Sequence, residues 1–175
     1  MKQKVKQFLK FRSKNNSQTE SNETTGMDVQ SISNEFKNIS VNLNDSQSID
    51  DCILYYNEKI LSMYPNDDEQ LRLFFQTYDL FPNITRLLEV YIPLFELSIL
   101  DDSKWSNGFI FLQSSILYVN PNDNIKECIY NFIFTIINSN NRPLLENSKE
   151  FFISILHNPS FSEELLKGQN LVKIW

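Results

Sequence analysis

The stretch from Phe109 to Ile137, FIFLQSSILYVNPNDNIKECIYNFIFTII, decides how the rest of the chain is interpreted. Two strongly apolar runs flank the polar residues 120–123, which read NPND. In the second run the apolar residues recur at spacings of three and four, and this pattern favours a helix over a strand. The sequence therefore predicts two helices packed as a hairpin, each too apolar to face water on all sides.

Length and composition are those of an ordinary globular domain. The chain has 175 residues, of which 41% are apolar and 22% charged. A domain of this size buries roughly 70% of its unfolded surface, so it needs no disulfide or metal ion to fold. We expect one all-α domain over residues 28–175, preceded by a basic tail at 1–14 and a flexible polar linker at 15–27.

Small residues are scarce throughout the sequence. There is no alanine, and the only glycines are Gly26, Gly108 and Gly168. Larger side chains hold packed helices apart, so we expect distances between helix axes near the upper end of the usual ~8–10 Å.

Apolar spacing and helix-stop residues place further helices on both sides of the central hairpin. The expected helices cover residues 28–44, 49–63, 68–80, 84–100, 107–119, 124–138, 143–157 and 160–168. Side chains that can accept a hydrogen bond from a first-turn N–H stand before most of them. The expected caps are Ser48, Asn66 or Asp67, Ser106 or Asn107, Asp123 and Ser160.

Pro93 lies inside the helix expected at 84–100. A proline there removes one backbone hydrogen bond and clashes with the preceding turn. We therefore expect a kink or break near residues 90–92.

A short internal repeat links two of the expected turns. Residues 60–67 contain Ile-Leu followed by Pro-Asn-Asp, and the same residues return in the same register at 116–123, an offset of 56. Antiparallel helices joined by short turns are typical of α-solenoids. The predicted architecture is a right-handed armadillo-like or HEAT-like stack of helical hairpins, with an irregular helical bundle as the alternative.

Charge is unevenly distributed along the chain. The first 14 residues hold six basic and no acidic side chains, whereas the remaining residues hold ten basic and 22 acidic, a formal charge of −12. An acidic body argues against nucleic-acid binding, because duplex affinity comes mostly from neutralised phosphates. The tail is interpreted either as a solvated segment or as a contact for anionic lipid or an acidic partner. Its candidate contact residues are Lys2, Lys4, Lys6, Lys10, Arg12 and Lys14.

Residues suited to catalysis or metal binding are few. A zinc site needs three or four ligands, but the sequence has one histidine, His157, and two distant cysteines, Cys52 and Cys128. We expect both thiols to be free and buried, and His157 to stabilise the C-terminus of its helix. Carboxylates at 67–69 and 101–102 are interpreted as helix caps. No phosphate-binding glycine motif is present, so no cofactor, metal or catalytic residue is assigned.

One set of aromatic residues has two interpretations. Tyr55, Tyr64, Tyr78 and Trp105 could line a concave binding groove, or they could belong to the core. The residues at 171–175, LVKIW, also have two interpretations. Either they fold back onto the domain, or the sequence is the N-terminal part of a longer helical-repeat protein.

Three functional hypotheses follow. The first is a non-catalytic protein–protein interaction module, either a helical-repeat scaffold or a regulatory or adaptor segment, in the cytoplasm. The second is a peripheral membrane protein anchored by its basic tail; no stretch reaches the ~18 apolar residues of a membrane span. The third is a viral-type helical bundle, which resembles the Bcl-2 class in length and all-α content and would bind a partner helix in a groove.

Overall fold

The structure, a computed structural model, describes residues 28–65, 67–100 and 105–161, and within these ranges it is helical with no strand. The predicted all-α class is confirmed, and the stretch between Phe109 and Ile137 forms two helices as predicted. Their predicted packing as a hairpin is wrong, because each of the two makes its main contacts with other helices. The helices, in chain order, are α2 (Val29–Val41), α3 (Ser46–Tyr55), the π-helical segment η1 (Tyr56–Ile60), α4 (Leu61–Met63), α5 (Asp68–Thr77), α6 (Phe81–Ser98), α7 (Ser106–Tyr118), α8 (Asp123–Asn138) and α9 (Arg142–His157).

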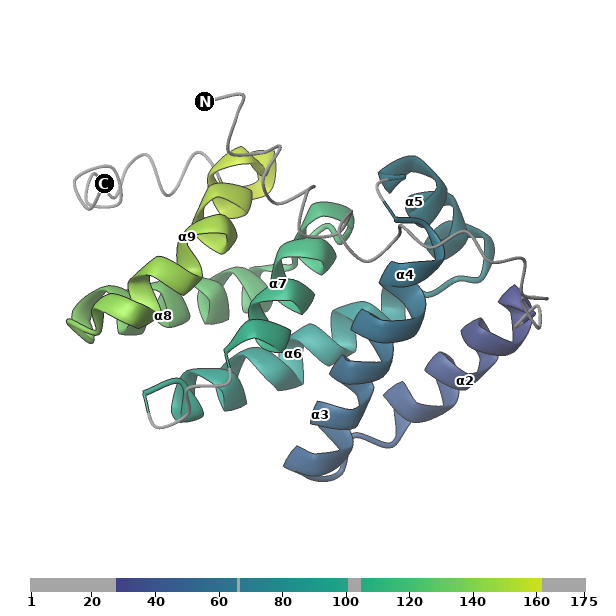
Figure 1. The fold of residues 1–175 in the computed structure, drawn as a ribbon, viewed down its shortest axis with the longest axis horizontal. Helices are drawn as coiled ribbons and strands as arrows, with labels where there is room; N and C mark the ends of the chain where they lie inside the picture. The colour runs from purple at the N-terminus through teal and green to yellow at the C-terminus, as the bar shows by residue number, and fades with distance from the viewer. Residues whose placement is uncertain (1–27, 66, 101–104, 162–175) are drawn as a thin grey trace, which may run out of the picture.

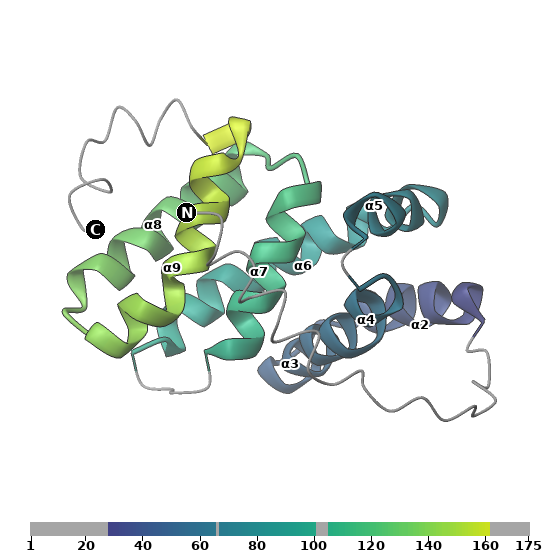
Figure 2. The same cartoon turned by 45° about the horizontal axis from the view of Figure 1, so that its top comes forward.

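Most of the helices lie in two layers (Figures 1 and 2). One layer is formed by α2, α6 and α8, which contact one another in that order. The other is formed by α3 with η1, then α7, then α9. Consecutive helices α2 and α3, α6 and α7, and α8 and α9 also pack together across the layers. The fold is therefore a row of three helix pairs, each of which buries its apolar face against the next.

Helix α5 interrupts this alternation, since it follows α4 and precedes α6 without belonging to a pair. It is attached through rings: Phe75 lies 6.2 Å from Tyr56, 5.9 Å from Phe81 and 5.5 Å from Tyr118 between ring centroids. Adding the sequence offset of 56 residues to η1 and α4 gives α7, and these elements lie in the same layer. Adding it to α6 gives α9, but these two helices lie in different layers. The extra helix α5 is the reason that the repeat does not continue.

The core is continuous and strongly aromatic. Tyr56 is fully buried at the start of η1 and contacts three phenylalanine rings at 5.1–6.2 Å between centroids. A second group joins α6 to α8 through Phe95 and Phe132, 5.2 Å apart. Burial of this kind contributes about 1.5–3 kcal/mol for each large apolar side chain. These contacts tie all three helix pairs together.

Several predicted helix starts are wrong by a few residues. Helix α3 is capped by Asp45, whose carboxylate accepts from the Ser48 N–H at 2.7 Å; Ser48 lies in the first turn and its Oγ accepts from the Asp45 N–H at 3.2 Å. Asn122 caps α8 in place of Asp123. Trp105 precedes α7 without a side-chain cap, so neither Ser106 nor Asn107 has the predicted role. Several capping residues stand in a row at each turn, and backbone conformation selects among them.

Of the kink or break predicted near Pro93, the break is wrong, because α6 continues through Pro93 to Ser98. Pro93 lies on the exposed side of the helix, whereas Tyr91, Ile92 and Phe95 are buried. Packing of the inner side holds the helix together while water can solvate the carbonyl that the proline leaves unpaired. Pro82, expected to lie before this helix, lies in its first turn, where a missing N–H has no consequence.

One glycine makes room for aromatic side chains of the neighbouring helix. A Cβ at Gly108, in the first turn of α7, would lie 2.2 Å from Tyr91 Oη and 2.6 Å from Phe95 Cζ of α6. No other residue type fits there without movement of these rings. The ends of the two rings therefore occupy the space that a side chain at position 108 would need.

Several predictions fall outside the described residues. They concern the basic tail, the linker, the carboxylates at 101–102, the helix stop at Gly168 and the apolar residues 171–175. Residues 159–161 are helical, so Ser160 lies inside this turn and its predicted role as the cap is wrong; the Asn158 side chain accepts from the Ser160 N–H at 2.9 Å. Across the described ranges, every helix is too short or too polar to cross a lipid bilayer.

Candidate functional site

A pocket of about 380 Å³ opens between α2 and α3. We call it the α2–α3 pocket. Ile39 and Cys52 give it an apolar floor, Tyr55 contributes one wall, and Asp51 places a carboxylate at its edge. The full lining consists of Asn38, Ile39, Asn42, Ser48, Asp51, Cys52 and Tyr55.

Helical spacing accounts for this lining. On α2, the residues at 35, 38, 39 and 42 follow one another at intervals of three, one and three, and therefore share one side of the helix. On α3, the residues at 48, 51, 52 and 55 follow the same intervals. Both sides lie next to the core-facing stripe, so each helix presents mixed polar and apolar side chains to the other.

Tyr55 connects the two helices at one end of the pocket. Its hydroxyl donates to Glu35 Oε2 at 2.9 Å and lies 3.4 Å from the Ile32 carbonyl oxygen. Burial first, and then the hydrogen bond and negative charge of Glu35, raise the pKa of Tyr55. The phenol therefore stays neutral at physiological pH and keeps donating to the Glu35 carboxylate.

The pocket carries negative charge. Asp51 lines it, and Asp51 Oδ1 accepts from Gln47 Nε2 at 2.8 Å. Glu35 accepts a hydrogen bond from Tyr55, which is itself a lining residue. The other polar lining side chains are two amides and a hydroxyl, and no lysine or arginine belongs to the lining. An apolar floor beside two carboxylates suits an apolar side chain that has a cation next to it.

The thiol in this pocket is not a reactive one. Cys52 is fully buried, and burial raises its pKa from 9.0 to about 12. A thiol with such a pKa is protonated and weakly nucleophilic at neutral pH. Both cysteines are free, as predicted, but Cys128 is only half-buried and that part of the prediction is wrong. Burial, followed by Glu127, Glu96 and Glu89, raises the pKa of Cys128.

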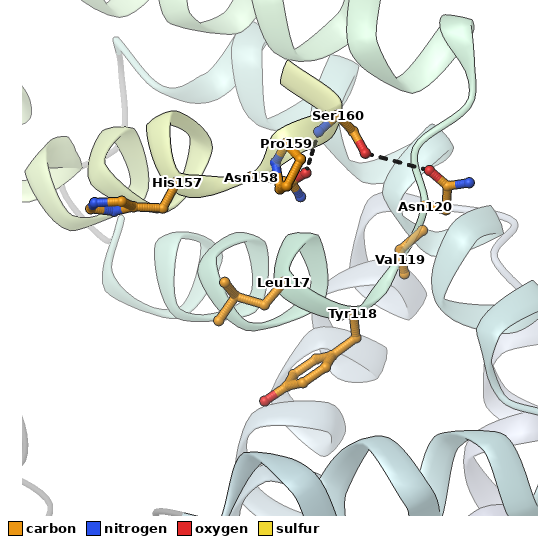
Figure 3. A pocket seen from close by; sticks show the side chains of 8 residues that line it. All are labelled: Leu117, Tyr118, Val119, Asn120, His157, Asn158, Pro159 and Ser160. Atoms are coloured by element: carbon orange, nitrogen blue, oxygen red, sulfur yellow. Dashed lines mark hydrogen bonds between the residues drawn. The ribbon is translucent and has the colours of Figure 1, made fainter. Parts of the chain in front are cut away.

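A second pocket, of about 290 Å³, lies where the C-terminal ends of α7 and α9 meet (Figure 3). Its lining consists of Leu117, Tyr118, Val119, Asn120, His157, Asn158, Pro159 and Ser160. Asn158 is buried and its amide donates to the Ile116 carbonyl at 2.8 Å while its Oδ1 accepts from the Ser160 N–H at 2.9 Å. Its polar atoms are thus used to join the two helix ends, which is a structural role.

The predicted aromatic groove is not assembled. Trp105 is buried and its Nε1 donates to the Ile99 carbonyl at 2.9 Å. Tyr64 and Tyr78 both pack on Phe74 of α5, with ring centroids 6.1 and 5.1 Å away. Of the four residues, Tyr55 lines the α2–α3 pocket. The core interpretation holds for Trp105, which is buried, and Tyr55, Tyr64 and Tyr78 are half-buried and pack against the core.

Two titratable residues considered in the sequence lie at helix ends. His157 is exposed in the last turn of α9, as predicted. Asp67 caps α5 by accepting from the Gln70 N–H at 3.1 Å, also as predicted. Within the described ranges, no three histidine, cysteine or carboxylate side chains are placed to hold a metal ion. The candidate contact residues of the tail, Lys2 to Lys14, lie outside the described residues.

Comparison of the chain with protein-family models, with curated proteins and with solved structures gave no match. The site must therefore be interpreted from its own chemistry. The sequence analysis did not identify the α2–α3 pocket. The available signal was the row of Glu35, Asn38 and Asn42 beside the apolar stripe of α2, at the spacing of one helix side.

Proposed function

We propose that the chain is a non-catalytic protein-interaction module, built as an armadillo-like or HEAT-like scaffold. Its α2–α3 pocket binds a short segment of a partner protein that carries an apolar side chain flanked by lysine or arginine. The observation that carries the proposal is the lining of that pocket, which contains Ile39, Cys52 and the Asp51 carboxylate but no basic residue. The Glu35 carboxylate is bonded to the lining residue Tyr55. A cytoplasmic location is part of the proposal, since both cysteines are free thiols.

The size of the pocket favours side chains over a cofactor. At about 380 Å³ it lies near the lower end of the ~300–1,000 Å³ typical of small-molecule sites. It is also open on one side of a helix pair, where a peptide can pass across it. Binding of this kind depends on one or two apolar anchors, with charged groups adding rate and specificity.

Peptide binding to the full chain tests the proposal. The probes are fluorescein-labelled ten-residue peptides with Phe-Leu at the centre and two flanking lysines, against the same peptides with flanking glutamates. We expect the lysine peptides to bind more tightly, with an affinity that falls as salt rises, because the pocket charges are screened. Asp51→Lys should weaken binding at least tenfold.

Glu146→Lys makes the same charge change on the exposed side of α9, far from α2 and α3, and serves as the matched control. It should bind like the unaltered chain. Equal affinity for lysine and glutamate peptides, or an equal effect of Asp51→Lys and Glu146→Lys, would contradict the proposed function.

Association with an anionic membrane is a second candidate function, favoured by the six basic residues of the tail. Each lysine or arginine near an anionic leaflet contributes roughly 1 kcal/mol. Flotation with vesicles of phosphatidylserine and phosphatidylcholine should recover the full chain in the vesicle fraction. A variant with Lys2, Lys4, Lys6 and Lys10 changed to glutamate should remain in the vesicle-free bottom fraction. Equal recovery of both chains with the vesicles rules this function out.

A further inference from the structure

We infer that the α2–α3 pocket is occupied, in the absence of a partner, by residues 6–10 of the same chain, Lys-Gln-Phe-Leu-Lys. The inference rests on the proposed function, because it names a segment of this chain as the first ligand of that pocket. Phe8 or Leu9 would fill the apolar floor. Lys6 and Lys10 would lie beside Glu35 and Asp51.

The two surfaces are complementary in charge and in apolar character. The tail has six basic side chains and no acidic one over residues 1–14, with Val5, Phe8 and Leu9 as apolar residues at helical spacing. Asp51 supplies one carboxylate to the lining of the pocket, and Glu35, which is bonded to the lining residue Tyr55, supplies a second one next to it. Gln47 and Tyr55 each bond one oxygen of these carboxylates. The second oxygen of each carboxylate can accept from a lysine ammonium group.

The linker has a suitable length. Its 13 residues, 15–27, have a root-mean-square span of about 20 Å if they behave as a flexible chain. The pocket lies at the C-terminal end of α2, and α2 is 13 residues long, which is about 20 Å. A tether whose span matches the distance to the site gives an effective concentration in the millimolar range. A segment with only millimolar affinity would therefore occupy the pocket about half of the time.

Another surface with exposed apolar side chains fits the tail less well. Leu97 of α6 is 77% exposed and Phe134 of α8 is 70% exposed, with Glu96 between them. Glu96 Oε1 already accepts from Thr135 Oγ1 at 2.7 Å. This surface is also farther along the row of helix pairs from residue 28, where the linker ends.

A tail that occupies the pocket would act as a competitor of the partner. A partner segment must displace residues 6–10, so its apparent affinity is lowered by the fraction of time for which the tail is bound. Removing the positive charge of the tail, by modification of lysine or by an anionic surface that attracts it, would open the pocket. Lysine modification or an anionic surface would in this way increase the affinity of the pocket for the partner.

Paramagnetic broadening in the full chain tests the inference. A nitroxide is attached at position 11 of a chain that carries Phe11→Cys and Cys128→Ser; Cys52 stays in place because it is buried and its thiol is protonated. We expect the amide signals of Ile39, Asn42 and Asp51 to lose at least half of their intensity. Signals of Glu146 and Glu150 on α9 should be unaffected.

Two controls separate the possible occupants. Lys6→Glu with Lys10→Glu in the labelled chain should restore the pocket signals, and these substitutions lie outside the described helices. A mixture of labelled chain without ¹⁵N and unlabelled chain with ¹⁵N should show no broadening. Broadening in that mixture would mean that a second copy of the chain is the occupant, which overturns the inference.

A peptide of residues 1–14, titrated into the full chain with Lys6→Glu and Lys10→Glu, separates this inference from the proposed function. If the peptide shifts the pocket signals but the attached tail never broadens them, the inference fails and the proposed function stands. If neither effect appears, both fail. Broadening centred on another surface, or spread evenly over the chain, would also overturn the inference.

Discussion

Gly108 lies directly against Tyr91, so closely that a Cβ on the glycine would be 2.2 Å from the tyrosine hydroxyl oxygen. Gly108 belongs to the first turn of α7 and Tyr91 to the middle of α6, and the end of the Tyr91 ring fills the space beside the glycine. Tyr91 also stacks on Phe95, 5.1 Å away between ring centroids, so neither ring can move alone.

Gly108→Ala should therefore destabilise the fold in spite of the better helix propensity of alanine. Overpacking of a core commonly lowers the unfolding free energy by 1–3 kcal/mol, and we expect a loss of about 2 kcal/mol in urea denaturation. Ser106→Ala, on the exposed side of the same turn, is the control and should change the unfolding free energy by less than about 0.5 kcal/mol. A neutral or stabilising Gly108→Ala would show that α6 and α7 are farther apart than described.

Pro93→Ala should stabilise the protein. Proline in a helix interior is about 3 kcal/mol less favourable than alanine, and α6 is continuous through this exposed position. The substitution returns an N–H that can bond the Glu89 carbonyl, so we expect the unfolding free energy to rise by about 1–3 kcal/mol. Pro82→Ala, in the first turn of the same helix, should have little effect. Loss of stability in Pro93→Ala would indicate that the proline imposes a bend that the packing requires.

Asn158→Ala should loosen the junction of α7 and α9. The substitution leaves the buried Ile116 carbonyl without the amide donor that lies 2.8 Å away, and it removes the acceptor of the Ser160 N–H. A buried polar group left unsatisfied costs about 1–3 kcal/mol. Faster hydrogen exchange at the last turn of α9 should accompany the loss. Asn120→Ala, which removes only a 3.4 Å contact with Ser160 at the surface, should leave exchange unchanged.

Alkaline pH should weaken the fold through Cys52. Burial raises the pKa of its thiol from 9.0 to about 12, so the folded chain keeps a proton that the unfolded chain loses. The stabilisation is complete below about pH 9 and is lost as pH rises toward 12, with a slope of about 1.4 kcal/mol per pH unit.

Urea denaturation at pH 8, 9.5 and 10.5 with a reductant measures this slope. Cys52→Ala should lower the unfolding free energy at pH 8 but weaken its decline at higher pH. Tyr55, Tyr56 and Cys128 also have raised pKa values. They contribute in both chains and cancel in the comparison. Parallel pH curves for the two chains would show that Cys52 is not buried as a thiol.

The two apolar helices between Phe109 and Ile137 illustrate what a single sequence predicts well and what it does not. Both are long, their apolar residues recur at helical spacing, and the turn between them contains a proline. These signals agree, so the helix type was predicted correctly. The pairing was not, because α7 packs mainly on α9 and α8 mainly on α6. At the helix starts the signals compete: Asp45 and Ser48 both can cap α3, and the choice depends on which residue takes an extended backbone conformation.

Other features depend on contacts between distant residues and were not predictable. The π-helical turn from Tyr56 to Ile60 has no composition signal, and neither does the approach of Gly108 to Tyr91. The α2–α3 pocket requires the relative placement of two helices, because its carboxylates come from both. The sequence showed which residues share one side of each helix, but it did not show which sides of the two helices face one another.

The row of helix pairs has a mechanical consequence. Each pair packs mainly on the next, so α2 and α3 are held by α6 and α7, while α8 and α9 are held from the other side of the same two helices. A pulling force applied at residue 28 and residue 161 would therefore detach the outer pairs one at a time and reach the middle pair last. Extension would proceed in steps, and a ligand clamped between α2 and α3 would raise the force needed for one of them.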